Sequence, residues 1–201
     1  MINIYNEDCL EAIKKLEDNS YDLAIVDPPY GIGDKMRGTR TMGQQMKEKD
    51  WNNDIPPKEY FLQLFRVSKN QIIWGSNYYS NYLPPSRCWV VWDKKMSGKI
   101  GFSMNELAYT SFDYTPKTYY QRADRNDRIH PCQKPIKLYE WLILEYAKEG
   151  DKILDTHLGS GSIAIACYNL GFDLTAYEID KDYYKAALKR INNHKKQIRL
   201  F

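Results

Sequence analysis

Residues 27–30 read Asp-Pro-Pro-Tyr and directly follow the short apolar run YDLAIV at residues 21–26. Proline lacks a backbone N–H and fixes φ, so two consecutive prolines end a sheet ladder and form a stiff corner. This corner holds a carboxylate, Asp27, on one side and an aromatic ring, Tyr30, on the other. A plain transition from strand to loop is the alternative interpretation, and the other motifs of the chain argue against it.

A second candidate site is the stretch DTHLGSGSIA at residues 155–164, where Gly159 and Gly161 separate an apolar strand from a helix. Small residues at such a turn let a ligand approach the backbone, and the helix N-terminus offers free N–H groups. Glu178 ends the following strand, where a Rossmann-type fold places a carboxylate on ribose hydroxyls. The pattern alone leaves three interpretations open: an NAD(P) site, an S-adenosylmethionine (SAM) site, or a structural turn.

The elements that must position these residues alternate between strands and helices. Because the strands lack two-faced alternation, the pattern predicts a mostly parallel sheet with helices on both faces. The polar stretches 31–55 and 113–134 are predicted loops, which at such lengths are usually functional or disordered. Apolar runs predict strands at 2–5, 21–27, 70–75, 87–93, 105–112, 151–155 and 173–180. Periodicity and capping residues predict helices at 9–16, 56–67, 135–150, 162–171 and from about 184 onward.

Composition sets broad limits on the class of protein. A length of 201 residues fits a single domain, and we expect one domain over residues 1–201. The net charge of +3 permits a polyanionic partner without demanding one. The four cysteines are scattered with no C-x-x-C pair, which predicts reduced thiols and no metal site. With neither a signal-peptide pattern nor a membrane-length apolar run, we expect a cytoplasmic protein without membrane contact.

Three motifs together carry a resemblance to a known family. DPPY at 27–30 comes first, HPCQKP at 130–135 opens a helix, and DTHLGSGS at 155–162 is followed by Glu178. This set resembles the beta-group SAM-dependent DNA amino-methyltransferases, in which the catalytic motif precedes the cofactor motif in a circularly permuted order. Matching segments run from residue 2 to about residue 192, so the resemblance covers nearly the whole chain.

The resemblance implies a Rossmann-like SAM-methyltransferase fold: a seven-stranded, mostly parallel sheet with one antiparallel strand and helices on both faces. The strand at 152–155 is then central and carries the glycine turn, and the strand at 22–27 is its neighbour. Both strands should end at the same edge of the sheet, which is where ligands bind in open α/β sheets. Two motifs that are far apart in sequence should therefore face one cleft.

The resemblance implies that the catalytic residues are Asp27, Pro28, Pro29 and Tyr30. The exocyclic amine of adenine is a poor nucleophile, so an enzyme must hold its N–H groups with acceptors in the plane of the amine. The Asp27 carboxylate supplies one acceptor, and the Pro28 carbonyl is the expected second, preorganised by the fixed φ of proline. Tyr30 would offer its face to a base flipped out of the duplex.

The resemblance also implies which residues bind SAM. The glycine turn should pass the methionine part, Glu178 should accept the ribose hydroxyls, and Asp8 should bind the adenine amino group, although a helix cap is the alternative for Asp8. Gln133 and Lys134 should close on the methionine end, although a solvated Lys134 is the alternative. The predicted cofactor-binding residues are Asp8, Cys9, Asp27, Gln133, Lys134, Asp155, His157, Gly159, Ser160, Gly161 and Glu178.

Two positions depart from the family pattern. Thr156-His157 replaces the Pro-Phe that usually follows the motif Asp, so the aromatic contact with SAM should be weaker. Cys132 stands where Thr is common, and this change should have little consequence.

Basic residues cluster in three polar stretches, at 34–49, 94–99 and 122–128. Such clusters at the rim of a cleft suit phosphate contacts, although a solvated surface is the alternative for any single residue. The chain leaves little sequence for a separate target-recognition domain, so we expect the polar loops to contact double-stranded DNA and to give a short or loosely specified site. The predicted DNA-binding residues are Lys35, Arg37, Arg40, Lys94, Arg122 and Arg125.

The leading prediction is a bacterial or phage-encoded DNA adenine-N6 methyltransferase of the restriction-modification type, acting as a monomer or homodimer. Methylation of cytosine N4 uses the same chemistry, but that branch more often has Ser in place of Asp27. RNA adenine-N6 methylation is a further alternative. An NAD(P) oxidoreductase would have no role for DPPY, and a DNA-binding module without catalysis would need no intact SAM site.

Overall fold

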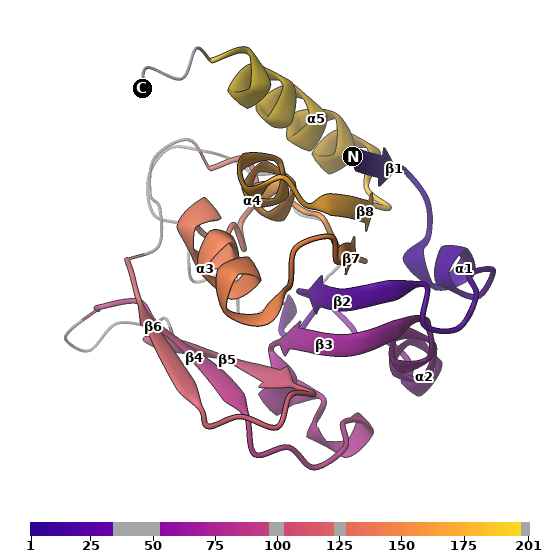
Figure 1. Ribbon diagram of the computed structural model, residues 1–201, viewed down its shortest axis with the longest axis vertical. Helices are drawn as coiled ribbons and strands as arrows, with labels where there is room; N and C mark the ends of the chain where they lie inside the picture. Colours follow the sequence, from indigo (N-terminus) through magenta and orange to yellow (C-terminus); the bar gives the residue numbers. More distant parts are fainter. Residues whose placement is uncertain (34–52, 97–102, 123–127, 198–201) are drawn as a thin grey trace.

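The structure is a computed structural model that describes residues 1–33, 53–96, 103–122 and 128–197. The strands in these ranges are β1 (Ile2–Tyr5), β2 (Tyr21–Val26), β3 (Ser68–Trp74), β4 (Trp89–Asp93), β5 (Asn105–Thr110), β6 (Lys117–Tyr120), β7 (Lys152–Asp155) and β8 (Asp173–Tyr177). They form one sheet in the order β1-β8-β7-β2-β3-β5-β4-β6 (Figure 1). Of these strands, β5 alone runs antiparallel to its neighbours, β3 and β4. The expected α/β fold with a mostly parallel sheet is therefore confirmed.

The expected number of seven strands is wrong, because the described residues form eight. The extra strand, β6, lies within the stretch that the sequence predicted as a polar loop, and it pairs with β4 in parallel. β6 is an edge strand with one face half-buried, where Tyr119 packs on Trp141 at 5.1 Å between ring centroids. A four-residue edge strand of sequence KTYY has no apolar run, so periodicity did not reveal it.

Helices cover both faces of the sheet, with α1 and α2 on one face and α3, α4 and α5 on the other (Figure 1). Strand β2 shows why both faces are buried: Leu23 and Ile25 belong to the core under α3 and α4, whereas Ala24 and Val26 belong to the core under α2. The helices are α1 (Cys9–Ile13), α2 (Lys58–Val67), α3 (Ile136–Tyr146), α4 (Ser162–Leu170) and α5 (Lys181–Lys196), with short 3-10 turns η3 (Ser76–Tyr78) and η4 (Ser80–Tyr82).

The sheet register brings the two candidate motifs together. Strand β2 pairs in parallel with β7, so that Leu23 lies opposite Ile153 and Ala24 opposite Leu154. Parallel neighbours end at the same edge, and DPPY follows β2 there just as the glycine turn follows β7. Strand β3 lies on the other side of β2 and ends at the same edge, at Gly75.

Candidate active site

A cavity of about 390 Å³ lies at this edge of the sheet. DPPY lines one end of it, and the glycine turn with the acids at the heads of α1 and α5 lines the other. Residues that were predicted from separate motifs therefore share one site. The lining residues used below are Asp8, Cys9, Asp27, Pro28, Pro29, Tyr30, Tyr60, Cys132, Lys134, Tyr139, Thr156, His157, Gly159, Ser160 and Glu178.

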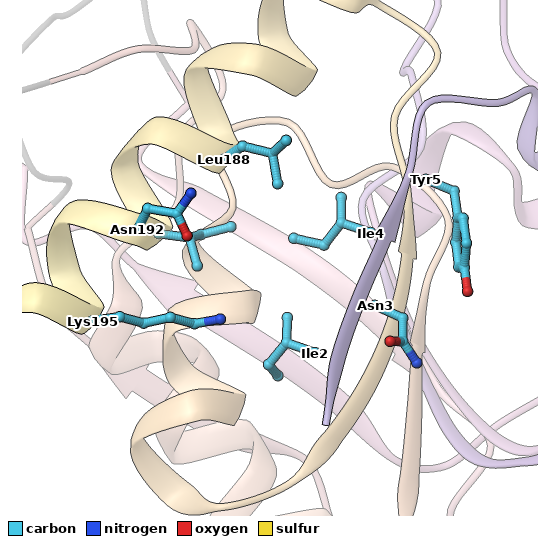
Figure 2. A pocket seen from close by; sticks show the side chains of 8 residues that line it. Ile2, Asn3, Ile4, Tyr5, Leu188, Asn192 and Lys195 are labelled. Carbon is cyan, nitrogen blue, oxygen red and sulfur yellow. The ribbon is translucent and has the colours of Figure 1, made fainter.

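A second hollow, of about 340 Å³, lies between the edge strand β1 and α5 and shares no lining residue with this cavity. Figure 2 shows Ile2 and Ile4 directed toward α5, with Leu188 on the facing side near Ile4. Asn3 and Tyr5 point to the other side of β1. Among the described residues, no carboxylate, thiol or imidazole lines this hollow. It is a packing groove, and the chemistry of the described residues concentrates in the larger cavity.

Side chains from distant elements fix the DPPY corner. The Tyr30 hydroxyl donates to Asp27 Oδ1 at 2.6 Å, and the Tyr30 ring stacks on Tyr78 at 5.1 Å between centroids. The ring also lies against the backbone of Gly75, where an added Cβ would come within 2.1 Å of Tyr30 Cε1. Gly75 has φ +70°, a conformation that glycine adopts without steric cost. Gly75 is therefore the residue that makes room for the Tyr30 ring.

The Lys134 ammonium occupies the centre of this corner, and its side chain is only 2% exposed. Lys134 Nζ lies 2.5 Å from Asp27 Oδ2, 3.0 Å from Glu106 Oε2 and 3.2 Å from the Tyr30 hydroxyl. A lysine has three N–H donors, and these three acceptors match them. The expected alternative of a solvated Lys134 is wrong. Its contact with the methionine end of SAM stays a prediction, and it would require one of the inward partners to be given up.

Burial and charge shift the pKa values of this cluster. Burial raises the pKa of the Asp27 carboxyl, and the Lys134 ammonium only partly offsets this effect. Burial disfavours the Glu106 carboxylate too, but Lys134 and Lys94 outweigh it and lower the pKa of Glu106 to about 2. For Lys134, burial would lower the pKa, but the carboxylates of Asp27 and Glu106 raise it above its usual value. Glu106 and Lys134 are therefore charged at neutral pH.

The two proline carbonyls share one hydrogen-bond donor. The buried Tyr79 hydroxyl lies 2.7 Å from the Pro28 carbonyl oxygen and 2.9 Å from that of Pro29. Burial raises the pKa of Tyr79 far above its usual value, so the hydroxyl keeps its proton. A carbonyl oxygen has two lone pairs, so Pro28 can accept a further hydrogen bond from a ligand.

Backbone groups fix the acids at the other end of the cavity. Glu178 accepts from the Gly159 N–H at 2.8 Å and, through its second oxygen, from the Asp180 N–H at 2.9 Å. Asp8 caps α1, since its Oδ1 accepts from the N–H groups of Leu10 at 2.8 Å and Glu11 at 3.3 Å. The cap interpretation of Asp8 is thus confirmed. It is compatible with a ligand contact, because a carboxylate offers about four acceptor positions.

His157, together with Thr156 one of the departures from the family pattern, lines the cavity at the glycine-turn end. Its Nδ1 lies 2.9 Å from Thr156 Oγ1, and its Nε2 lies 3.8 Å from Cys9 Sγ. Burial lowers the pKa of His157 to about 4, so the ring is neutral at neutral pH. The ring contacts Tyr60 edge-on at 5.4 Å, and the Tyr60 hydroxyl lies 2.6 Å from Thr156 Oγ1. Thr156 and His157 thus hold the Tyr60 ring at the cavity wall, and the weaker aromatic contact with SAM stays a prediction.

Three of the predicted cofactor residues lie behind the cavity wall. Asp155 is buried, accepts from the His157 N–H at 3.0 Å, and has its pKa raised by burial to about 8. Gln133 is buried and accepts from the Ile129 N–H at 3.2 Å. Gly161 packs under α5, since an added Cβ would come within 2.9 Å of Ile191 Cδ1. None of the three lines the cavity, whereas Ser160 does.

The predicted DNA-binding residues lie in different places. Lys94 turns inward and pairs with Glu106 at 2.6 Å, with its side chain 15% exposed. Arg122 is exposed on the loop after β6. Lys35, Arg37, Arg40 and Arg125 lie outside the described residues.

Sequence reasoning missed several residues that shape the site. Glu106 gave a detectable signal, because an acid directly before the apolar run LAY of β5 needs a partner inside the fold. Gly75, Tyr78 and Tyr79 follow β3 and gave no local signal. Their roles depend on the fold bringing the end of β3 beside the end of β2.

The fold is an α/β fold with a ligand-sized cavity at the carboxyl edge of a mostly parallel sheet. The profile of the DNA methylase family N6_N4_Mtase matches residues 73–189, which is more than half of the chain. The chain therefore belongs to this DNA methylase family and is a DNA methyltransferase of the N6-adenine or N4-cytosine class.

Curated relatives support the family at low identity. The type II methyltransferase M.HpaI of Haemophilus parainfluenzae is 24% identical, over 92% of this chain and 72% of the relative. The type II methyltransferase M2.MboI of Moraxella bovis is 24% identical, over 94% of this chain and 86% of the relative. The relatives thus include bacterial type II enzymes of the restriction-modification kind.

Solved structures share the fold over nearly the full length. The complex of M1.HpyAVI with SAM is 21% identical, with a TM-score of 0.65, and covers 96% of this chain and 100% of its own. TTHA0409 of Thermus thermophilus, complexed with S-adenosyl-L-methionine, is 16% identical with a TM-score of 0.65, over 98% of each chain. The cytosine-N4-specific PvuII DNA methyltransferase is 14% identical with a TM-score of 0.66, over 96% of this chain and 90% of its own.

Within the described residues, no helix combines the length and apolar character needed to cross a membrane. The same residues contain no group of three or more His, Cys, Asp or Glu side chains that could hold a metal ion.

Proposed function

We propose that this chain transfers a methyl group from SAM to the exocyclic N6 amine of an adenine flipped out of double-stranded DNA. The observation that carries the proposal is the shared cavity. Asp27 and Tyr30 line one end, Asp8, Gly159 and Glu178 line the other, and sheet pairing of β2 with β7 joins them. An acceptor for an amine and acceptors for a nucleoside are thus held within one space.

The residues at the glycine-turn end fit SAM. The amino groups and ribose hydroxyls of SAM are hydrogen-bond donors, and the lining carboxylates of Asp8 and Glu178 are acceptors. The rings of Tyr60 and His157 border the same space and suit the flat adenine. When bound, SAM supplies an electrophilic methyl group. The contacts of Gln133, Asp155 and Gly161 would act from behind the wall, through the backbone of the loops that they hold.

At the other end, Asp27 and the Pro28 carbonyl would accept hydrogen bonds from the target amine and turn its lone pair toward the methyl donor. The methylated amine must lose a proton, and a carboxylate whose pKa is raised by burial accepts one more readily. One face of Tyr30 packs on Tyr78, so a flipped base would stack on the opposite face. Preorganised acceptors of this kind need no rearrangement during the reaction.

Asp27 favours adenine over cytosine, because the resemblance associates Ser at this position more often with cytosine-N4 transfer. The TM-scores do not discriminate, since the cytosine-N4-specific PvuII enzyme matches at 0.66 and M1.HpyAVI at 0.65. Cytosine N4 therefore stays the second candidate, and RNA adenine N6 the third.

Further parts of the proposal rest on motif order and charge. DPPY precedes the glycine turn, which supports the permuted beta-group order. We place the whole chain in one methyltransferase domain whose polar stretches, about 31–55 and 113–134, contact DNA. We propose a monomer or homodimer, encoded by a bacterium or phage and located in the cytoplasm.

The decisive experiment expresses the protein in a host that lacks DNA methylation and sequences the host DNA for modified bases. Modified adenine in a recurrent site is the expected result, with Asp27→Ala as the inactive control. Modified cytosine would instead support cytosine-N4 transfer, and modified RNA would support RNA adenine-N6 transfer. Calorimetric titration of the purified protein with SAM and with NAD(P) tests the cofactor independently.

A further inference from the structure

Four charged residues of alternating sign run inward from the rim of the site to the catalytic corner. Lys94 follows β4, Glu106 lies in β5, Lys134 precedes α3, and Asp27 follows β2. Lys94 Nζ lies 2.6 Å from Glu106 Oε1, and Lys134 Nζ lies 3.0 Å from Glu106 Oε2. Lys134 Nζ in turn lies 2.5 Å from Asp27 Oδ2. Each oxygen of Glu106 therefore engages one lysine.

Surrounding aromatic residues hold the inner lysine in place. Lys134 Nζ lies 5.2 Å from the centroid of the Trp74 ring and 5.7 Å from that of Tyr30, within range of a cation–π attraction. Turning the side chain outward would leave the carboxylates of Asp27 and Glu106 without this partner, at a large cost for buried charges. The position of the ammonium is therefore determined by its two carboxylates.

We propose that Glu106 is a positioning residue for methyl transfer: it shares the Lys134 ammonium with Asp27 and so sets the orientation and basicity of Asp27. The inference rests on the proposed function, in which Asp27 holds the target amine and takes its proton. Without Glu106, Lys134 would pair with Asp27 alone. The Asp27 oxygens would then be held more tightly by the lysine and would be weaker acceptors for the amine.

The other titratable groups near Asp27 do not carry this role. Burial raises the pKa of each of the phenols and of the Cys132 thiol, so all of these groups are neutral at neutral pH. Asp155 also faces Asp27, and burial raises its pKa to about 8. Among the described residues, the charges that act most strongly on Asp27 are thus those of Lys134 and Glu106. The neutral groups facing Asp27 are Tyr30, Tyr60, Tyr79, Cys132 and Tyr139.

The test measures the titration of Asp27 in the full chain without cofactor or DNA. Carboxyl carbon NMR gives the midpoint, and Asp27→Asn identifies the resonance. Glu106→Gln removes a repelling charge and should lower the midpoint by about one pH unit, whereas Lys134→Met removes an attracting charge and should raise it. Lys134→Arg keeps the positive charge, so its Asp27 midpoint should stay near the wild-type value. If Lys134→Met does not fold, this variant still tests the effect of the charge at position 134. Glu145→Gln, which removes a carboxylate paired with Lys117 outside the cavity, is the matched control and should change nothing.

The kinetics of methyl transfer provide a second measurement, because substituting a residue with a purely structural role would not shift the pH profile of kcat. With radiolabelled SAM and DNA from a host without methylation, Glu106→Gln should lower kcat by about three- to tenfold, with the acid limb of the pH profile shifted to lower pH. KM for SAM should stay near the wild-type value. An Asp27 midpoint in Glu106→Gln that matches wild type, or lies above it, would overturn the inference.

The two proposals fail in distinguishable ways. If the Asp27 midpoint shifts as expected but wild-type protein methylates no nucleic acid, the proposed function fails, while the coupling of Glu106 to Asp27 stands. If wild type methylates DNA and the midpoint does not move, the coupling fails and the proposed function stands.

Discussion

The two ends of the cavity are fixed by different kinds of contact. At the glycine-turn end, Glu178 is held by the N–H groups of Gly159 and Asp180, and Asp8 is held by the first turn of its own helix. At the DPPY end, Asp27 is held by side chains, above all by Lys134, which lies more than a hundred residues away in the sequence. One end is built by local backbone, and the other by distant side chains.

This difference predicts how each end responds to substitution. Backbone donors remain when a side chain is exchanged, so the glycine-turn end should lose affinity gradually. A cluster of buried charges and stacked rings loses several contacts when one member changes, because the remaining members are left without partners. Substitutions at the DPPY end should therefore lower kcat more than they raise KM for SAM.

The largest effect is expected for Asp27→Ala. Losing a preorganised group at the reacting amine should lower kcat on the order of a hundredfold or more. Methyl transfer to unmethylated DNA measures the rate, and calorimetry should show that SAM still binds. Asp18→Ala is the control, because Asp18 pairs with Arg66 outside the cavity and the proposed DNA-contacting stretches, and its side chain is 71% exposed. Turnover of Asp27→Ala near the wild-type rate would remove Asp27 from its proposed role.

Gly75→Ala should have the second largest effect. The added Cβ would overlap the Tyr30 ring, which cannot retreat because it stacks on Tyr78 and bonds Asp27. We expect about a tenfold loss of kcat, together with about 1–2 kcal/mol of lost stability from the left-handed backbone.

Gly171→Ala is the matched control for this clash. Gly171 has φ +78° against +70° for Gly75, but an added Cβ meets nothing within 4 Å. It should lose similar backbone stability in thermal unfolding while keeping its kcat. An equal loss of kcat in both variants would show that Gly75 acts through backbone strain and not through Tyr30.

The same contrast explains what could be predicted from the sequence. Asp8, Glu178 and DPPY were found because each belongs to a short local motif at the end of an element. That the strands carrying the two motifs are neighbours followed from the resemblance, and the parallel pairing of β2 with β7 places both motifs at one edge. The local end of the cavity was thus largely predictable.

The rest of the site could not be predicted from the sequence, because it depends on contacts between elements that are remote in sequence. Glu106 and Tyr79 reach the corner only because β5 and the end of β3 lie beside β2 in the fold. Lys134 was assigned to the cofactor, but its inward direction is set by two carboxylates, one of which was not recognised. Strand β6 was missed because an edge strand with polar residues lacks an apolar run.

A pair of Tyr→Phe variants sharpens the comparison. Tyr79→Phe removes the donor to the Pro28 and Pro29 carbonyls, and Tyr60→Phe removes the hydroxyl that meets Thr156. Each loses about 1 kcal/mol of stability from one buried hydrogen bond. We expect Tyr79→Phe to lower kcat severalfold, and Tyr60→Phe to weaken SAM binding in calorimetry with kcat nearly unchanged. Identical kinetic signatures would mean that the two ends do not act separately.

The smallest effect concerns acid stability at His157. Its pKa is lowered by burial to about 4, below the usual value of an unfolded histidine, so the unfolded chain binds the extra proton first. The contribution of the neutral His157 ring to the free energy of unfolding is therefore present above about pH 6.5 and is lost as the pH falls toward 4. Because the ring borders the cavity, solvent reduces the loss between pH 7 and pH 5 to about 1 kcal/mol.

His157→Phe removes this titration and keeps an aromatic ring. The difference in unfolding free energy between the variant and wild type, from urea denaturation, should move by that amount in favour of the variant at pH 5. Carboxylates that titrate in both proteins cancel in this difference. A difference that is the same at both pH values would mean that the ring stays accessible enough to be protonated in the folded protein. The cavity wall at the cofactor end would then be more open than the ring contact with Tyr60 indicates.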